Sequence, residues 1–195
     1  DLPGRNLSLR EPFVLVPLAD AKRAATPANR PAMPERLSDI VFALLGRTAA
    51  AGESVVVKPS NFANVLMREA ARRTAGRALF LYSDLESFLI SVEKGGLPLR
   101  KYARRLFGNI AGDSGVPLRW PARDVFQMSD LEIAALAWHM QIDQFQRAAR
   151  LFEPDRLASL DCDAFLTDPT RALNAIDAFF GLGLGAEHVD GVVRG

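Results

Sequence analysis

Short apolar runs alternate with segments of helical period along most of the chain. The runs of strand length lie at residues 13–16, 54–59 and 77–82 and within residues 156–166. The run SVVVKP is rich in β-branched residues, as expected for a strand that is buried on both faces. Pro17 is expected to end the first run, because proline cannot donate a ladder hydrogen bond.

Segments with apolar residues at helical spacing follow these runs. They occupy residues 35–51, 61–76, 83–96, 99–110, 130–152 and 168–184. Gly52 suits the end of the first helix and Pro169 the first turn of the last. Strands that alternate with helices favour βαβ units. The pattern therefore predicts a single α/β domain over residues 1–195, with a parallel β-sheet flanked by helices on both faces.

Composition narrows the class of protein. The chain has 195 residues, 49% of them hydrophobic and 24% charged, which is typical of one globular domain. A net charge of +1 argues against a protein that coats nucleic acid or anionic membrane. Cys162 is the one cysteine, which excludes a disulfide scaffold and multi-cysteine metal sites. The sequence has no signal peptide and no apolar run near the length of a membrane span, so we expect a cytoplasmic protein. We also expect it to bind no metal.

The tetrapeptide Ser-Asp-Leu-Glu occurs twice, at residues 83–86 and 129–132. Both copies match a capping box, in which the serine and the glutamate satisfy each other's backbone N–H groups, and such a cap is worth about 1 kcal/mol. Ser129 follows a loop, and capping explains it fully. Ser83 follows a predicted strand directly, so its helix would begin at the carboxyl edge of the sheet, where the helix dipole favours an anion.

A set of motifs resembles the sulfotransferase family of the P-loop nucleotide-binding superfamily. The motifs are VVVKPSNFAN, GRALFLYSDLESFLISVEKGG, AALAWHMQIDQF and FLTDPTRALNAIDAFFGL, and together they span roughly residues 53–184. The resemblance implies a three-layer P-loop sandwich. It also implies 3′-phosphoadenosine 5′-phosphosulfate as the sulfuryl donor, and a small-molecule or carrier-bound acceptor.

The resemblance implies roles for four residues. Lys58 matches the family's strand-end lysine, and Ser60 stands at the position of the histidine that acts as general base. Ser83 stands at the position of an arginine that binds the donor's 3′-phosphate, and Ser91 matches the serine eight residues further on. Lys58 and Ser60 would then lie near the transferred group. Two positions depart from the family, because serine lacks the charged fork of arginine and is no base unaided.

No stretch matches the glycine-rich phosphate loop that the family has after its first strand. The family's late glycine-rich donor loop is also absent from the sequence, which closes with residues 181–195, GLGLGAEHVDGVVRG. We therefore expect either a longer natural chain that supplies this loop or a relative that has lost donor chemistry. Sulfuryl transfer to a hydroxyl or amine is the leading hypothesis. The alternative is a non-catalytic sulfotransferase-like domain that binds a ligand or a protein. A P-loop kinase is a third option, with Asp161 as the candidate magnesium-holding acid.

Each singled-out residue also has a simple structural explanation. Lys58 can reach solvent from a strand end, Ser60 can cap the next helix, and Ser91 can be an exposed helix residue. Cys162 can be a small buried residue within a strand, and His139 a partly exposed helix residue. A solvated helix face explains the basic residues Arg100, Lys101, Arg104 and Arg105 as well as an acidic partner does.

Overall fold

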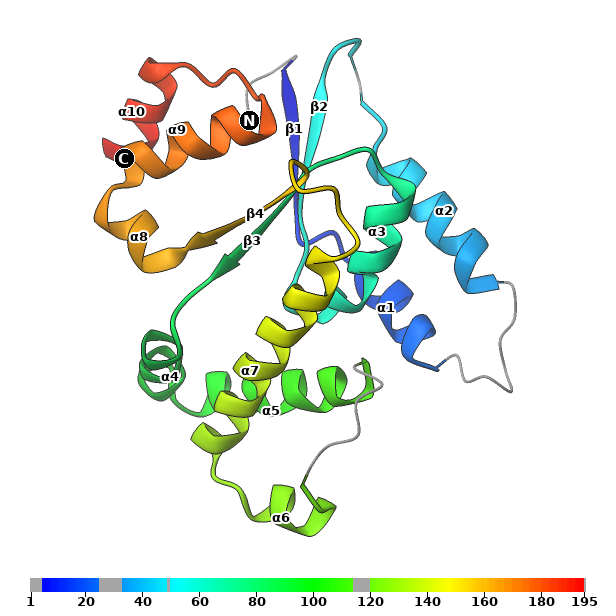
Figure 1. Cartoon of the computed structure of the whole chain (residues 1–195), viewed down its shortest axis with the longest axis vertical. Coiled ribbons are helices and arrows are strands. Elements are labelled where there is room, and N and C mark those ends of the chain that lie inside the picture. Colours follow the sequence, from blue (N-terminus) through cyan, green and yellow to red (C-terminus); the bar gives the residue numbers. More distant parts are fainter. Residues whose placement is uncertain (1–4, 25–32, 49, 114–119, 195) are drawn as a thin grey trace.

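The computed structural model describes residues 5–24, 33–48, 50–113 and 120–194 (Figure 1). It combines short parallel strands with many helices, which confirms the α/β class. In chain order the elements are β1 (Asn6–Arg10), α1 (Leu15–Ala24), α2 (Met33–Leu45), β2 (Ser54–Lys58), the 3₁₀-helix η1 (Asn61–Leu66), α3 (Met67–Arg73), β3 (Ala78–Tyr82), α4 (Leu85–Lys94), α5 (Gly96–Asp113), α6 (Ala122–Gln127), α7 (Asp130–Ala149), β4 (Leu157–Asp161), α8 (Cys162–Thr167), α9 (Pro169–Phe180) and α10 (Ala186–Arg194).

The described strands form two parallel pairs instead of one continuous sheet. Strand β1 pairs with β2, so that Arg10 lies opposite Lys58 where both strands end. Strand β3 pairs with β4 in the same way, with Tyr82 opposite Asp161. Each pair therefore brings two carboxyl ends together, and these are the positions where α/β proteins place their ligands.

The first predicted strand is wrong. Strand β1 is Asn6–Arg10, and the apolar run at residues 13–16 leads into helix α1. The buried residues Leu15, Leu18 and Ala19 lie three and four positions apart, which is the spacing of a helix face. Pro17 lies in the first turn of this helix, where its missing N–H has no helical partner to lose.

Several predicted boundaries also move. Helix α2 ends at Leu45 instead of residue 51, and Gly52 adopts a left-handed backbone (φ +80°) in the turn before β2. The segment after β2 begins as a 3₁₀-helix before it becomes α3. Strand β4 ends at Asp161, so Cys162 is a half-buried residue at the start of α8 and does not lie within a strand.

The core is built mainly between helices. One cluster joins α1, α2 and η1 through Leu15, Leu18, Ala19, Val41, Ala63 and Leu66. Two others join α4, α5, α6 and α7, where Ala103, Leu106 and Ile110 of α5 are fully buried. Of the described strand residues only Asn6 is buried, so the strands position functional groups more than they fill the core.

A buried ion pair ties the two groups of helices together. The Arg23 guanidinium of α1 binds Asp113 at the end of α5, with Nε 2.6 Å from Oδ1 and Nη2 2.9 Å from Oδ2. The same Nη2 donates to the carbonyl of Phe62 at 2.5 Å. The side chain of Asp113 is only 1% exposed. Helix α5 is therefore fixed to α1 and η1 at one end, while it packs on α4 and α7 along its length.

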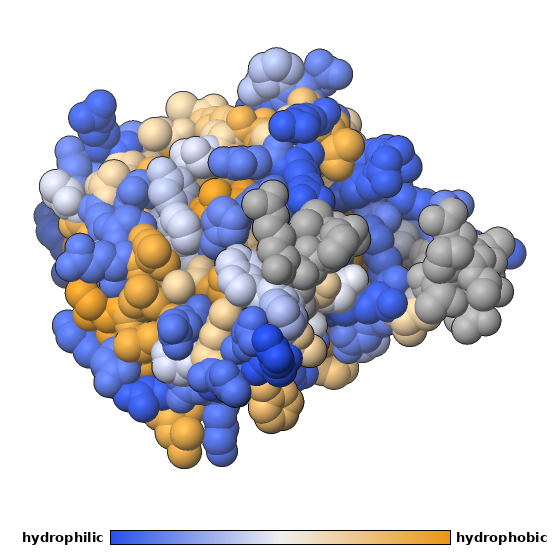
Figure 2. Space-filling model, turned by 60° about the horizontal axis from the view of Figure 1, so that its bottom comes forward, coloured by the Kyte–Doolittle hydropathy of each residue, from blue (hydrophilic) through white to orange (hydrophobic). Residues whose placement is uncertain are grey.

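The face of the molecule turned forward in Figure 2 mixes hydrophobic patches with hydrophilic side chains. Large apolar side chains are exposed on α4, α5 and α6, among them Ile90, Leu97 and Phe126. None of the described helices combines the length and apolar composition needed to cross a membrane.

Candidate functional site

Lys58 and Glu11 form an ion pair where β1 and β2 end. The Lys58 Nζ lies 3.0 Å from Glu11 Oε1, and the backbone N–H of Glu11 donates to the Lys58 carbonyl at 2.6 Å. The two side chains are 62% and 55% exposed. An acid and a base are thus held together at a strand end, where a substrate could reach both.

Glu11 has a strained backbone. It is the one described non-glycine residue with positive φ, at 47°. Pro12 follows it, and proline disfavours helical conformations in the preceding residue. A side chain in the left-handed region costs about 1 kcal/mol or more, and such strain collects at functional sites. The strained residue is thus the one whose carboxylate forms the ion pair with Lys58.

Ser60 carries a buried hydroxyl that lacks a hydrogen-bond partner among the described residues. It stands at the N-cap position of η1, but its side chain makes no capping bond. Its carbonyl makes the hydrogen bond expected at the start of this helix, accepting from the N–H of Ala63 at 2.9 Å. Capping therefore does not explain this serine. An unsatisfied buried hydroxyl costs about 1–3 kcal/mol, and a ligand group that bonds it would remove the cost.

Helix α5 supplies an aromatic and basic wall beside these residues. Tyr102 meets Phe62 edge to face, with ring centroids 5.3 Å apart, and the Arg105 guanidinium lies 4.9 Å from the Phe62 centroid. Burial raises the pKa of the Tyr102 phenol, the Glu11 carboxylate raises it further, and Arg105 opposes both. Helix α5 packs on η1, so this wall lies next to the segment that follows the end of β2. We call Glu11, Lys58, Ser60, Phe62, Tyr102 and Arg105 the Lys58 site.

The end of β3 is built differently. Ser83 follows the strand, and its carbonyl accepts from Trp138 Nε1 at 2.9 Å. The N-cap of α4 is Asp84, whose carboxylate accepts from the N–H of Ser87 at 2.7 Å. The capping box predicted for Ser83 and Glu86 is therefore wrong, because the neighbouring aspartate is an equally good cap and stands next to the first helical residue.

The second copy of the tetrapeptide is capped as predicted. The Ser129 hydroxyl accepts from the N–H of Glu132 at 3.3 Å, and Glu132 Oε2 accepts from the N–H of Ser129 at 2.7 Å. The Ser129 hydroxyl also donates to Glu132 Oε2 at 2.7 Å, and this bond, followed by the one from the Ser129 N–H, lowers the pKa of the Glu132 carboxyl.

Carboxylates gather at the ends of β3 and β4. The hydroxyl of Ser87 bonds Asp84 Oδ2 at 3.2 Å and Asp163 Oδ2 at 3.0 Å. The hydrogen bond from the N–H of Ser87 is the main cause that lowers the pKa of the Asp84 carboxyl. Asp161, the candidate magnesium-holding acid, caps α8 by accepting from the N–H of Asp163 at 2.7 Å. We call Asp84, Ser87 and Asp163 the Asp84 cluster.

The structure thus separates the four predicted site residues into two pairs. Lys58 and Ser60 belong to the Lys58 site. Ser83 lies beside the Asp84 cluster, and Ser91 is exposed further along α4. Among the described residues, no group of three or more His, Cys, Asp or Glu side chains could hold a metal ion.

Sequence analysis missed four members of the Lys58 site, and one of them, Phe62, had no signal of its own. Glu11 has a recognisable position, since it comes directly after a strand and before a proline. The hydrophobic pattern predicts that strand at residues 13–16, beyond Glu11, and so does not single Glu11 out. Tyr102 and Arg105 had only the signal of a basic helix, which a solvated face explains equally well. Searches of protein-family models, curated proteins and solved structures give no match to the chain.

Proposed function

We propose that the protein transfers a sulfuryl group from 3′-phosphoadenosine 5′-phosphosulfate to a hydroxyl or amine acceptor, with the reaction at the Lys58 site. The fold proposed with it is the P-loop sulfotransferase-like three-layer sandwich, of which the two parallel strand pairs would be parts. The observation that carries the proposal is the meeting of Lys58, a strained Glu11 and the unpartnered Ser60 hydroxyl at one strand end.

The Lys58 site fits an anionic group undergoing transfer. The ammonium of Lys58 and the guanidinium of Arg105 offset negative charge, and a compact point charge such as lysine suits the oxygens of a sulfuryl group. The Ser60 hydroxyl can donate one further hydrogen bond without first giving up a protein partner. The packed rings of Phe62 and Tyr102 give the site an aromatic side.

Glu11 supplies the base that Ser60 cannot. Its carboxylate is placed to accept the proton that the acceptor hydroxyl or amine loses as its oxygen or nitrogen bonds sulfur. Lys58 holds this carboxylate by the 3.0 Å ion pair. When bound, the donor would supply the activated sulfuryl group: the bond between sulfur and the 5′-phosphate oxygen would break, and 3′-phosphoadenosine 5′-phosphate would leave with its electron pair.

The predicted donor site at the end of β3 fits less well. Ser83 and Ser91 are neutral, and a phosphate beside Ser83 would lie near the carboxylates of Asp84 and Asp163. Like charges at a short distance disfavour binding. This observation favours the second candidate, a non-catalytic sulfotransferase-like domain that binds a ligand or a protein.

Calorimetric titration with 3′-phosphoadenosine 5′-phosphate, the donor's product, tests the proposal. We expect binding that Ser91→Ala and Lys58→Ala each weaken by about tenfold, the loss of one charged or polar contact. Arg150→Ala, at the exposed end of α7, is the matched control and should leave the affinity unchanged. No binding at millimolar nucleotide would exclude sulfuryl transfer by this chain.

Activity separates the two candidates if the nucleotide binds. For a transferase, Glu11→Gln should abolish sulfuryl transfer to hydroxyl or amine acceptors while nucleotide affinity stays the same. For the non-catalytic domain, neither the native chain nor the variant would transfer the group.

A further inference from the structure

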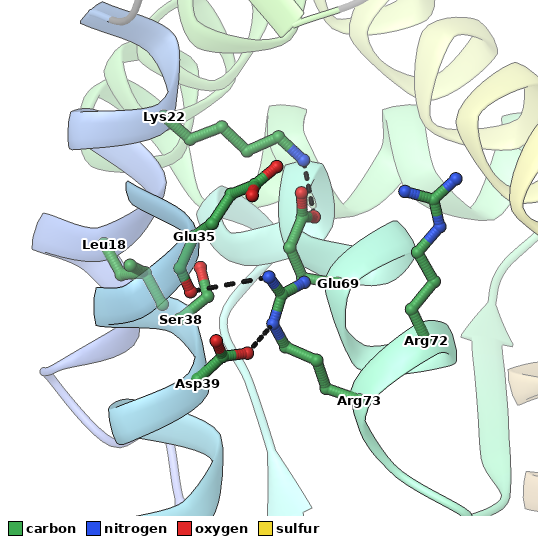
Figure 3. Close-up of a pocket in the computed structure, with 8 residues that line it drawn as sticks. All are labelled: Leu18, Lys22, Glu35, Ser38, Asp39, Glu69, Arg72 and Arg73. Carbon is green, nitrogen blue, oxygen red and sulfur yellow. Dashed lines mark hydrogen bonds and ion pairs between the residues drawn. The ribbon is translucent and has the colours of Figure 1, made fainter. Parts of the chain in front are cut away.

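Helices α1, α2 and α3 line a cavity that shares no residue with the Lys58 site (Figure 3). Its volume is about 370 Å³, within the range of small-molecule pockets. It is lined by Leu18 and Lys22 of α1, by Glu35, Ser38 and Asp39 of α2, and by Glu69, Arg72 and Arg73 of α3. Three cations and three carboxylates therefore face one small space.

Two ion pairs fix the walls of this cavity. Lys22 Nζ bonds Glu69 Oε2 at 2.5 Å and the carbonyl of Val65 at 2.7 Å. Arg73 binds the carboxylate of Asp39 and donates to the carbonyl of Glu35 at 3.4 Å. The first pair joins α1 to α3 and the second joins α2 to α3, so the charges on the walls are held in place before any ligand arrives.

Two charges in the cavity have no partner. Among the described residues, neither the carboxylate of Glu35 nor the guanidinium of Arg72 has a hydrogen bond or ion pair, and the pairs drawn in Figure 3 leave both free. In that view the two groups lie on opposite sides of the Lys22–Glu69 pair. The Glu35 carboxylate is thus available on one side of this ion pair, and the Arg72 guanidinium on the other.

Part of the lining is buried, whereas Glu35 and Arg72 are themselves exposed to solvent. Leu18 and Ser38 are 2% and 3% exposed, and the side chain of Glu69 is 18% exposed. Interactions between charges are stronger where water is partly excluded. Because the other four charges are paired, a lone anion on Arg72 would leave Glu35 as an unpaired negative charge, and a lone cation on Glu35 would leave Arg72 unpaired. A ligand with both charges meets neither penalty.

We propose that this cavity binds a small zwitterion with one carboxylate and one ammonium group, as in free amino acids and short peptides. Arg72 binds the carboxylate through its planar fork, and Glu35 accepts from the ammonium. The Lys22–Glu69 and Arg73–Asp39 pairs position both side chains. The site is independent of the sulfuryl transfer proposed above, since it uses none of the same residues.

Three related peptides test the charge requirement: glycyl-leucine, its N-acetyl form and its C-terminal amide. We expect calorimetry to show that the free dipeptide binds, and that each blocked form binds about tenfold more weakly, the loss of one charge-assisted contact. Glycyl-leucine should also bind about tenfold more weakly to Glu35→Gln and to Arg72→Gln. Arg68→Gln, an exposed residue of the same helix outside the cavity, is the matched control and should bind like the native chain.

The pattern of selectivity guards against a merely structural effect. Glu35→Gln should erase the preference for the free over the N-acetyl peptide, while it keeps the preference over the amide. Arg72→Gln should do the reverse, and circular dichroism should show both variants folded. Equal affinity for the three peptides, or no binding of glycyl-leucine at millimolar concentration, would overturn the proposal.

Discussion

The carboxyl ends of β1 and β2 and those of β3 and β4 share one local plan and differ in charge. In both places a parallel pair ends, and a helix begins three residues after the last residue of β2 or β3. At the first end the helix-start residue Ser60 leaves its hydroxyl unused beside Lys58. At the second end Asp84 already occupies the N–H of Ser87 with a carboxylate.

The difference shows what an anion site needs beyond a helix N-terminus at the edge of a sheet. Free N–H groups and the helix dipole favour an anion there. At the start of α4 the Asp84 carboxylate already accepts from the N–H of Ser87, so this helix start carries a negative charge of the chain itself. The Lys58 site keeps the unused hydroxyl of Ser60 and sets two cations, Lys58 and Arg105, against its one carboxylate, which is why we propose it as the site of an anionic ligand.

Breaking the link between α1 and α5 should have the largest effect. Arg23→Ala would leave Asp113 buried without its partner, and we expect it to lower the free energy of unfolding by about 3–5 kcal/mol. Urea denaturation measures this loss. Arg123→Ala removes an ion pair whose arginine is 85% exposed, and it should change stability little. Equal effects of the two substitutions would mean that the Arg23 pair does not hold α5 in place.

Removing the negative charges at the end of β3 should make the two strand ends more alike. We expect Asp84→Asn combined with Asp163→Asn to raise the affinity for 3′-phosphoadenosine 5′-phosphate severalfold, because asparagine still caps α4 but no longer repels a phosphate. Titration calorimetry measures the change, with Asp155→Asn as the exposed control. Unchanged affinity would show that the nucleotide phosphate does not approach this cluster.

Substitutions in the two copies of Ser-Asp-Leu-Glu should lower the stability less than Arg23→Ala does, and by different amounts. Ser129→Ala should lower the free energy of unfolding by about 1 kcal/mol, since it removes one half of a capping box. Ser83→Ala should cost less, because Asp84 caps α4 in its place. Thermal unfolding of the two variants under the same conditions measures both losses of stability. A larger loss at Ser83 would contradict the assigned caps.

The smallest expected change is in the titration of Tyr102. Its pKa is raised by burial and by Glu11, so Glu11→Gln should lower that pKa towards the ordinary value of about 10. Ultraviolet absorbance follows the phenolate, and Tyr102→Phe identifies its signal among the two tyrosines of the chain. An unchanged titration in Glu11→Gln would place Glu11 too far from Tyr102 for a shared site.

The same shift affects stability at alkaline pH. A phenol with a raised pKa in the folded state contributes stability that is fully present below about pH 10 and is lost as the pH rises through the folded value. The native chain should therefore lose more stability in this range than Tyr102→Phe does.

Local sequence was sufficient for several features. The β-branched run predicted β2, the apolar stripe and capping box predicted the start of α7, and Pro169 lies at the start of α9 as expected. Lys58 and Ser60 are two residues apart, so their nearness needed no tertiary information. The failures were also local. An apolar run before Pro17 is compatible with a strand or a helix, and Asp84 competes with Ser83 for the same cap.

The charge of each strand end was decided by the tertiary structure. Glu11 meets Lys58 across 47 residues of sequence because β1 and β2 pair in parallel, and Ser87 meets Asp163 across 76 because β3 and β4 do. Short-range periodicity says which residues form a strand or helix, since it depends on neighbours within a turn or two. Which distant side chains meet depends on strand pairing and on the packing of α5, and no spacing within either segment encodes it.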